Sequence, residues 1–279
     1  MSNEVYPQAP VRFVAFTAHF PLAPRLQRQE NQEAVYERLA ETFPLLEIVN
    51  AIQIPITFGG ESVPAAPQIP QKLRMLNRER TRSVTLGPRL LAVESTDHQS
   101  YDHLRELLVD VLGALVEVAQ PAGINGVALQ YIDEIRHPSA HGARDWQGLI
   151  QDPLIGAVNL LDAEIEQTSA ITIYKLTDAH EMRIVYGAAP EGFVVDPNGP
   201  LRVRPAGEGP FFRLDIASEW KAPGESVPPF AVDAVLAIAD DLHAPIREAF
   251  ENAITEDLRN HFRASPEDAT PEVESVSST

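Results

Sequence analysis

The alternation of apolar and polar residues predicts strands and two amphipathic helices in the first half of the chain. Within residues 11–20, most of the odd-numbered and most of the even-numbered residues are apolar, so both faces of the predicted strand are apolar. This is typical of a strand covered on both faces. Leucine and valine recur at helical spacing over residues 100–120, where Ser100 can cap the helix. A shorter helix is predicted at residues 30–43. Further strands are predicted at residues 45–57, 71–82, 83–95 and 124–135.

The pattern of the second half predicts a hairpin, short strands and a C-terminal helix. Its predicted strands lie at residues 164–175, 181–186, 193–195 and 211–217. Residues 230–262 have a helical pattern, and Pro245 should interrupt or kink that helix because proline lacks the backbone donor. Together these elements predict an α+β fold, in which long amphipathic helices pack on a mostly antiparallel sheet.

The order of the elements also predicts how the chain is divided. Each half begins with strands and ends its strand set near a long helix, which suggests two related α+β halves at residues 1–136 and 137–263, although no residue-level repeat is visible. Residues 264–279 carry four acidic residues, no basic residue and few large apolar residues. They are therefore predicted to form a disordered acidic tail.

The negative charge of the chain is concentrated in its second half. The formal net charge is −18, of which residues 1–120 contribute −3 (11 Lys/Arg and 14 Asp/Glu) and residues 121–279 contribute −15 (11 and 26). Such a charge repels phosphates, so nucleic acid is not expected as a partner. It is compatible with a basic protein partner and also with a role in solubility alone.

Cysteine content and hydropathy indicate the cellular compartment in which the protein is expected. Cysteine is absent, which excludes disulfides, thiolate zinc sites and a cysteine nucleophile. Residues 1–10 include Glu4 and have no apolar run behind a basic flank, so no signal peptide is expected. No stretch approaches the roughly 20 apolar residues that span a bilayer. We therefore expect a soluble, cytoplasmic protein without a membrane partner.

Few motifs in the sequence carry chemistry. The two glycine-rich phosphate loops, G-x-x-x-x-G-K-[ST] and G-x-G-x-x-G, are absent, and so is the nucleophile motif G-x-S-x-G. His137 and His141 are four residues apart, but Pro138 and Gly142 disfavour the helix that would place both on one face. No metal site and no cofactor are expected.

Two carboxylates at the end of a predicted strand are the candidates for catalysis. Asp133 and Glu134 close an apolar strand, a place where many folds carry catalytic carboxylates. Neighbouring residues of a strand point to opposite faces, so these two cannot act as a facing pair. The structural alternative is that one of them pairs with an arginine at the sheet edge.

A basic segment is the other candidate site. Residues 71–89 are net +5, with only Glu79 opposing six basic side chains. These are Lys72, Arg74, Arg78, Arg80, Arg82 and Arg89. On one continuous strand they would form a stripe that holds an anionic ligand or the acidic half of a second subunit, so a homo-oligomer is one arrangement that the pattern allows. A turn within residues 77–81 would instead leave them on a solvated hairpin face or paired with acids of the second half.

Three segments together resemble a known family. They are residues 9–16 (APVRFVAF), residues 126–135 (GVALQYIDEI) and residues 250–259 (FENAITEDLR). Their order and spacing resemble a sporadically distributed, uncharacterised bacterial family of similar length, although the first segment lacks the acidic residue expected there. The resemblance implies one fold from end to end, and it brings no established activity or catalytic residues.

Two classes of function remain open from the sequence. The leading hypothesis is a non-enzymatic protein that binds another protein in a bacterial defence or toxin-neutralising setting, because motifs for chemistry are missing and the acidic surface suits a basic partner. The alternative is an enzyme that binds an anionic small molecule or nucleic acid through the arginines of residues 72–89 and uses Asp133 or Glu134 for acid–base work. Arginines that converge with a carboxylate in one concave pocket would favour the enzyme.

Overall fold

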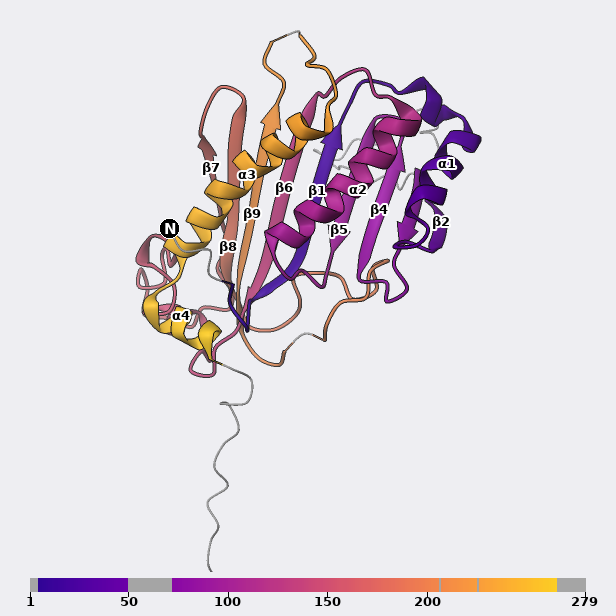
Figure 1. Ribbon diagram of the computed structural model, residues 1–279. Coiled ribbons are helices and arrows are strands. Elements are labelled where there is room, and N and C mark those ends of the chain that lie inside the picture. The colour runs from indigo at the N-terminus through magenta and orange to yellow at the C-terminus, as the bar shows by residue number, and fades with distance from the viewer. Residues whose placement is uncertain (1–4, 50–71, 206, 225, 265–279) are drawn as a thin grey trace, which may run out of the picture.

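A computed structural model describes residues 5–49, 72–205, 207–224 and 226–264 of the chain (Figure 1). Its centre is a nine-stranded sheet in the order β2-β3-β4-β5-β1-β6-β9-β8-β7, in which every neighbouring pair is antiparallel. The strands are β1 (Val11–His19), β2 (Leu45–Val49), β3 (Lys72–Leu76), β4 (Arg82–Gly87), β5 (Leu90–Ser95), β6 (Gly126–Ile135), β7 (Ala170–Lys175), β8 (His180–Ala189) and β9 (Phe211–Lys221). The predicted class, α+β with an antiparallel sheet, is confirmed, and the sheet dominates the fold.

Helices α1 (Gln29–Leu39), α2 (Tyr101–Ala119) and α3 (Val232–Ala253) cover one face of this sheet (Figure 1). Ser100 caps α2 as predicted, since its hydroxyl accepts a hydrogen bond from the backbone N–H of His103. The leucines of α2 face the sheet, and Leu108, Leu112 and Leu115 are completely buried. The helical layer and the strand side chains beneath it make one core.

Both halves of the chain contribute to the same sheet. Strands β1 and β6, both within residues 1–136, pair with each other at its centre, and residues 137–263 contribute β7, β8 and β9. Beside each of them lies the last strand before a helix, β5 before α2 and β9 before α3. Outward from the centre, the order β1-β5-β4-β3 on one side matches the order β6-β9-β8-β7 on the other. A common origin of the two halves stays a prediction. The tail prediction also stays untested, because residues 265–279 lie outside the described residues.

Two predicted elements differ in the structure. Helix α3 passes through Pro245 without interruption, and the break falls at Ile254, before α4 (Glu256–Arg263). There the chain leaves the helix because Ile254 forms a bridge with Ile150, a contact between distant segments. The strand predicted at residues 193–195 is absent, because Pro190 and Pro197 leave too short a stretch between them for strand pairing. None of the helices in the described ranges is both long enough and apolar enough for a membrane crossing.

Candidate functional site: a cavity between α3, α2 and β6

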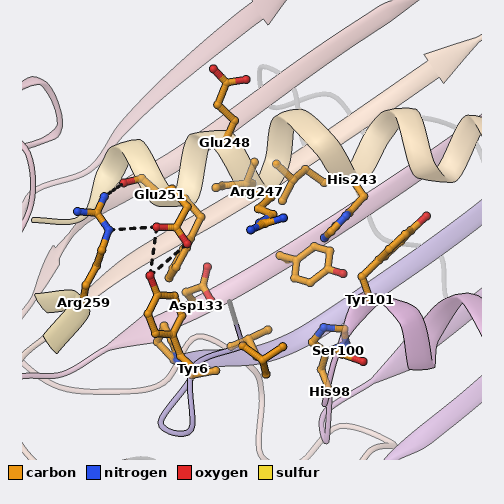
Figure 2. Close-up of a pocket in the computed structure, with 18 of the residues that line it drawn as sticks. Tyr6, His98, Ser100, Tyr101, Asp133, His243, Arg247, Glu248, Glu251 and Arg259 are labelled. Carbon is orange, nitrogen blue, oxygen red and sulfur yellow. Dashed lines mark hydrogen bonds and ion pairs between the residues drawn. The ribbon is translucent and has the colours of Figure 1, made fainter. Parts of the chain in front are cut away.

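A cavity of about 840 Å³ lies under α3, between the N-terminal end of α2 and strands β1 and β6. Residues 5–11 and α4 contribute to its opposite end. Figure 2 shows His243 and Arg247 pointing from α3 into this space, with Asp133 below them and Tyr101 at one side. The cavity therefore joins segments from both ends and from the middle of the chain.

The floor of the cavity is polar. Tyr131 and Asp133 are two residues apart on β6, so both face the helices. Next to them the β1–β6 register shifts between Val11 and Phe13, which marks a β-bulge at Arg12. The Tyr131 hydroxyl is buried, and no described residue forms a hydrogen bond with it.

Asp133 is the most unusual carboxyl group of the cavity. The residue is only 4% exposed, and within the described part of the chain its carboxylate has no hydrogen bond or ion pair. Burial, with a smaller contribution from the charge of Asp215, raises the pKa of Asp133 to about 8. The group is therefore mostly protonated at neutral pH unless a ligand stabilises its charge.

Aromatic rings form the wall beside Asp133. Tyr101 and His243 stack with their ring centroids 3.9 Å apart, and His98 meets Tyr131 edge-on at 5.1 Å. Burial, with a smaller contribution from the nearby His243, lowers the pKa of His98 to about 4. Burial, together with the charge of Arg247, lowers the pKa of His243 to about 4. Both imidazoles are therefore neutral at physiological pH.

The end of the cavity near α4 is held by charged pairs. The Tyr6 hydroxyl donates to both carboxylate oxygens of Glu251, at 3.2 and 3.1 Å. Arg259 forms ion pairs with Glu251 and with Glu256, and Arg263 also pairs with Glu256. These contacts fix the N-terminal segment against α3 and α4, so this end of the cavity is rigidly built.

Glu134 lies on the other face of β6, as strand geometry predicts for the residue next to Asp133. It accepts hydrogen bonds from Arg12 and from Arg136, both at 2.9 Å. Burial tends to raise the pKa of Glu134, but these two hydrogen bonds outweigh it and lower the pKa below its usual value. Glu134 is thus a paired structural carboxylate, and Asp133 alone of the two faces the cavity.

Of the two alternatives for the basic segment, the structure has the turn, so the continuous stripe does not form. Strand β3 ends at Leu76 and β4 begins at Arg82, so a turn separates them, and one continuous strand over residues 72–82 is wrong. Asn77 causes the turn, because its side-chain oxygen accepts the backbone N–H groups of Thr81 and Arg82.

The six basic residues are also dispersed over different parts of the fold. Arg80 pairs with Glu47, and Arg82 pairs with Asp97, so these partners come from the first half rather than the second. Lys72 and Arg74 lie on β3, Arg78 is exposed in the turn, and Arg89 lies at the opposite end of β4. None of the six lines the cavity that contains Asp133.

Other groupings of reactive side chains give no second site. His180 Nε2 lies 2.6 Å from the Ser218 hydroxyl, but Ser218 is completely buried and outside the cavity, so a substrate cannot reach it. Among the described residues no cluster of three or more His, Cys, Asp or Glu side chains could hold a metal ion.

Helix α3 contributes residues to the cavity that were not among the candidates predicted from the sequence. His243, Arg247 and Glu251 recur every four residues, which places them on one helix face as a polar stripe facing the cavity. That spacing was the available signal, but only the tertiary structure shows that the stripe faces Asp133.

Comparison with known proteins adds no further assignment. Neither a protein-family model nor a curated protein sequence matches this chain. The resemblance to a sporadically distributed bacterial family therefore stays a prediction, and the function has to be inferred from the geometry of the site.

Proposed function

We propose that this chain is a non-enzymatic binding protein that recognises a basic protein partner, and that its cavity receives a basic side chain of that partner. The observation that carries the proposal is Asp133, which faces the cavity while buried and without a hydrogen-bonding partner in the described part of the chain. A buried carboxylate is costly unless it is paired. An ammonium or guanidinium group supplies both the missing donors and the opposite charge.

The walls of the cavity also suit a cation. Tyr131, Tyr101 and Phe250 offer aromatic rings, whose faces attract positive charge. The two neutral histidines do not repel a cation. The charged residues that line the cavity are Asp102, Asp133, Glu248, Glu251, Glu256, Arg247, Arg259 and Arg263. Acids outnumber arginines among them, and the net charge of −18 would further attract a basic partner.

The enzyme alternative draws support from one observation only. A carboxyl group with a pKa of about 8 suits proton transfer near neutral pH. However, that hypothesis needs the arginines of residues 72–89 to meet the carboxylate, and they lie outside the cavity. The histidines beside Asp133, with pKa values of about 4, are also weak bases for such chemistry. The defence or toxin-neutralising setting stays a prediction.

A small organic cation tests the proposal directly. We expect ethylguanidinium to bind the cavity with a dissociation constant in the millimolar range, which corresponds to a binding free energy of about −4 kcal/mol. Ethylurea, a neutral molecule of the same shape, should bind much more weakly. The affinity for ethylguanidinium should fall at least tenfold in Asp133→Asn. It should stay unchanged in Asp162→Asn, which removes an equal charge from an exposed site outside the cavity.

Proton release provides a second readout of the same binding. A cation stabilises the ionised form of Asp133, so binding at pH of about 7 should release close to one proton, and binding at pH of about 9.5 should release almost none. Calorimetry at each pH, in two buffers that differ in ionisation enthalpy and carry no cationic group, measures this number. Equal affinity of ethylguanidinium for wild type and Asp133→Asn, or equal affinity of wild type for ethylurea, would refute the proposal.

A further inference from the structure

Strand β7 forms the outer edge of the sheet in the second half of the chain (Figure 1). Its inner neighbour is β8, and no described strand lies on its other side. The backbone N–H of Leu176 donates to His180 and that of Thr168 donates to Ala188, so even-numbered residues direct their backbone groups toward β8. The N–H and C=O groups of the odd-numbered residues 169–175 therefore point outward.

The side chains of this edge are apolar and exposed. Ile171 is 63% exposed and Ile173 is 59% exposed. Both lie on the sheet face opposite the helices, since Ile173 is in register with Arg183, Ala217 and finally Gln130. Proteins usually protect such edges with proline or charge, but the sequence AITIYK has no proline and only Lys175 as a charge.

We propose that β7 pairs with β7 of a second copy of this chain, which joins the two sheets into one. The pairing is antiparallel, with Thr172 opposite Thr172 of the partner subunit. In this register the outward backbone groups of Ile171 form hydrogen bonds with those of Ile173 of the partner subunit. The twofold symmetry gives the equivalent pair between Ile173 and Ile171 of the partner subunit. The four isoleucines then form one apolar cluster on the helix-free face, and the helices of both copies lie on the other face.

A second copy fits this edge because the edge is self-complementary. In the proposed register an isoleucine meets an isoleucine on both sides of the twofold axis, and each outward donor meets an acceptor. Both copies carry a net charge of −18, so screening by salt should strengthen the association. An association through the arginines of residues 72–89 and acidic surfaces would weaken with salt instead.

A disulfide cross-link tests the register. Residues opposite each other in a non-hydrogen-bonded pair have Cα atoms about 4.5 Å apart, within the range of about 4.4–6.8 Å that a disulfide spans. The chain has no cysteine, so Thr172→Cys introduces a single thiol at the proposed axis. On mild oxidation it should form a covalent dimer in high yield, whereas Leu161→Cys, 72% exposed and outside β7, should not.

A charge substitution tests the surface without a cross-link. Ile173→Lys should raise the dissociation constant of the dimer at least tenfold in analytical ultracentrifugation between about 1 μM and about 100 μM. Leu161→Lys should leave it unchanged. Both side chains are exposed, so the circular dichroism spectrum should be that of the wild type.

Three outcomes would overturn the proposal: a wild type that stays monomeric over this range, an Ile173→Lys variant that dimerises like wild type, or a Thr172→Cys variant that cross-links no better than Leu161→Cys. Residues of β7 do not line the cavity, so ethylguanidinium binding should survive Ile173→Lys.

Discussion

The polar side chains on the two faces of β6 differ in whether they have hydrogen-bonding partners. On the face away from the helices, Gln130 donates to Asp215 at 2.7 Å, and Glu134 is held by two arginines. On the face toward α3, Tyr131 and Asp133 line the cavity. The Tyr131 hydroxyl has no hydrogen-bonding partner among the described residues, and burial and the charge of Asp215, with no hydrogen bond, set the raised pKa of Asp133. One strand thus carries a satisfied, structural face and an unsatisfied one. Unsatisfied buried groups point to a missing ligand rather than to stability.

The largest effect should come from removing a paired group. Glu134→Ala leaves Arg12 and Arg136 without their carboxylate partner, and their side chains are only 15% and 18% exposed. We expect the free energy of unfolding to fall by about 3 kcal/mol, as is usual when one partner of a buried ion pair is removed. Urea denaturation at neutral pH measures it. Glu106→Ala, an exposed site on α2, is the control, and a loss below about 1 kcal/mol would contradict this interpretation of the paired face.

Removing the unpaired neighbour should have the opposite sign. The pKa of Asp133 lies at about 8 in the folded state, above its usual value of 3.8. The folded state therefore binds the proton more tightly, and the stability contributed by this group falls as the pH rises from about 4 to about 8. Asp133→Asn should raise the free energy of unfolding by more than about 1 kcal/mol at pH of about 8 and by much less at pH of about 4. Equal stability of the two proteins at both pH values would show that the carboxyl group has a partner.

The smallest effect should come from Tyr131. Its hydroxyl makes no hydrogen bond within the described residues, so Tyr131→Phe should change the free energy of unfolding by less than about 0.5 kcal/mol. Gln130→Ala, one residue earlier, breaks the hydrogen bond to the Asp215 carboxylate and should lower it by about 1.5 kcal/mol. Thermal denaturation of Tyr131→Phe and Gln130→Ala compares the loss of stability on the two faces of β6 at a second pair of neighbouring residues. Similar losses of stability in the two variants would contradict the proposed difference between the two faces.

The elements with strong periodicity could be predicted from the sequence. Strand β6 and helix α2 agree closely with their predicted ranges, because burial on a regular pattern determines both. The opposite orientations of Asp133 and Glu134 follow from strand geometry alone. The turn at Asn77 was one of two alternatives, since local sequence could not show whether its side chain would accept two backbone N–H groups.

The cavity could not be predicted in the same way. Its lining combines Tyr6, Tyr101, Asp133 and His243, which are far apart along the chain and meet only through strand order and helix packing. The end of α3 shows the same limit, because a bridge between Ile254 and Ile150 decides it rather than Pro245. Local propensity contains no information about such contacts between distant segments.

The central β1–β6 pair has a consequence for how the protein is made. Strand β1 leaves the ribosome before the other eight described strands, and β5 can join it before β6 has been made, so the other edge of β1 stays unpaired until β6 is complete. Strand β6 must then expose its own outer edge until β9 is complete. Newly made chains therefore present an unpaired apolar strand through much of synthesis, which makes folding slow and favours association with chaperones.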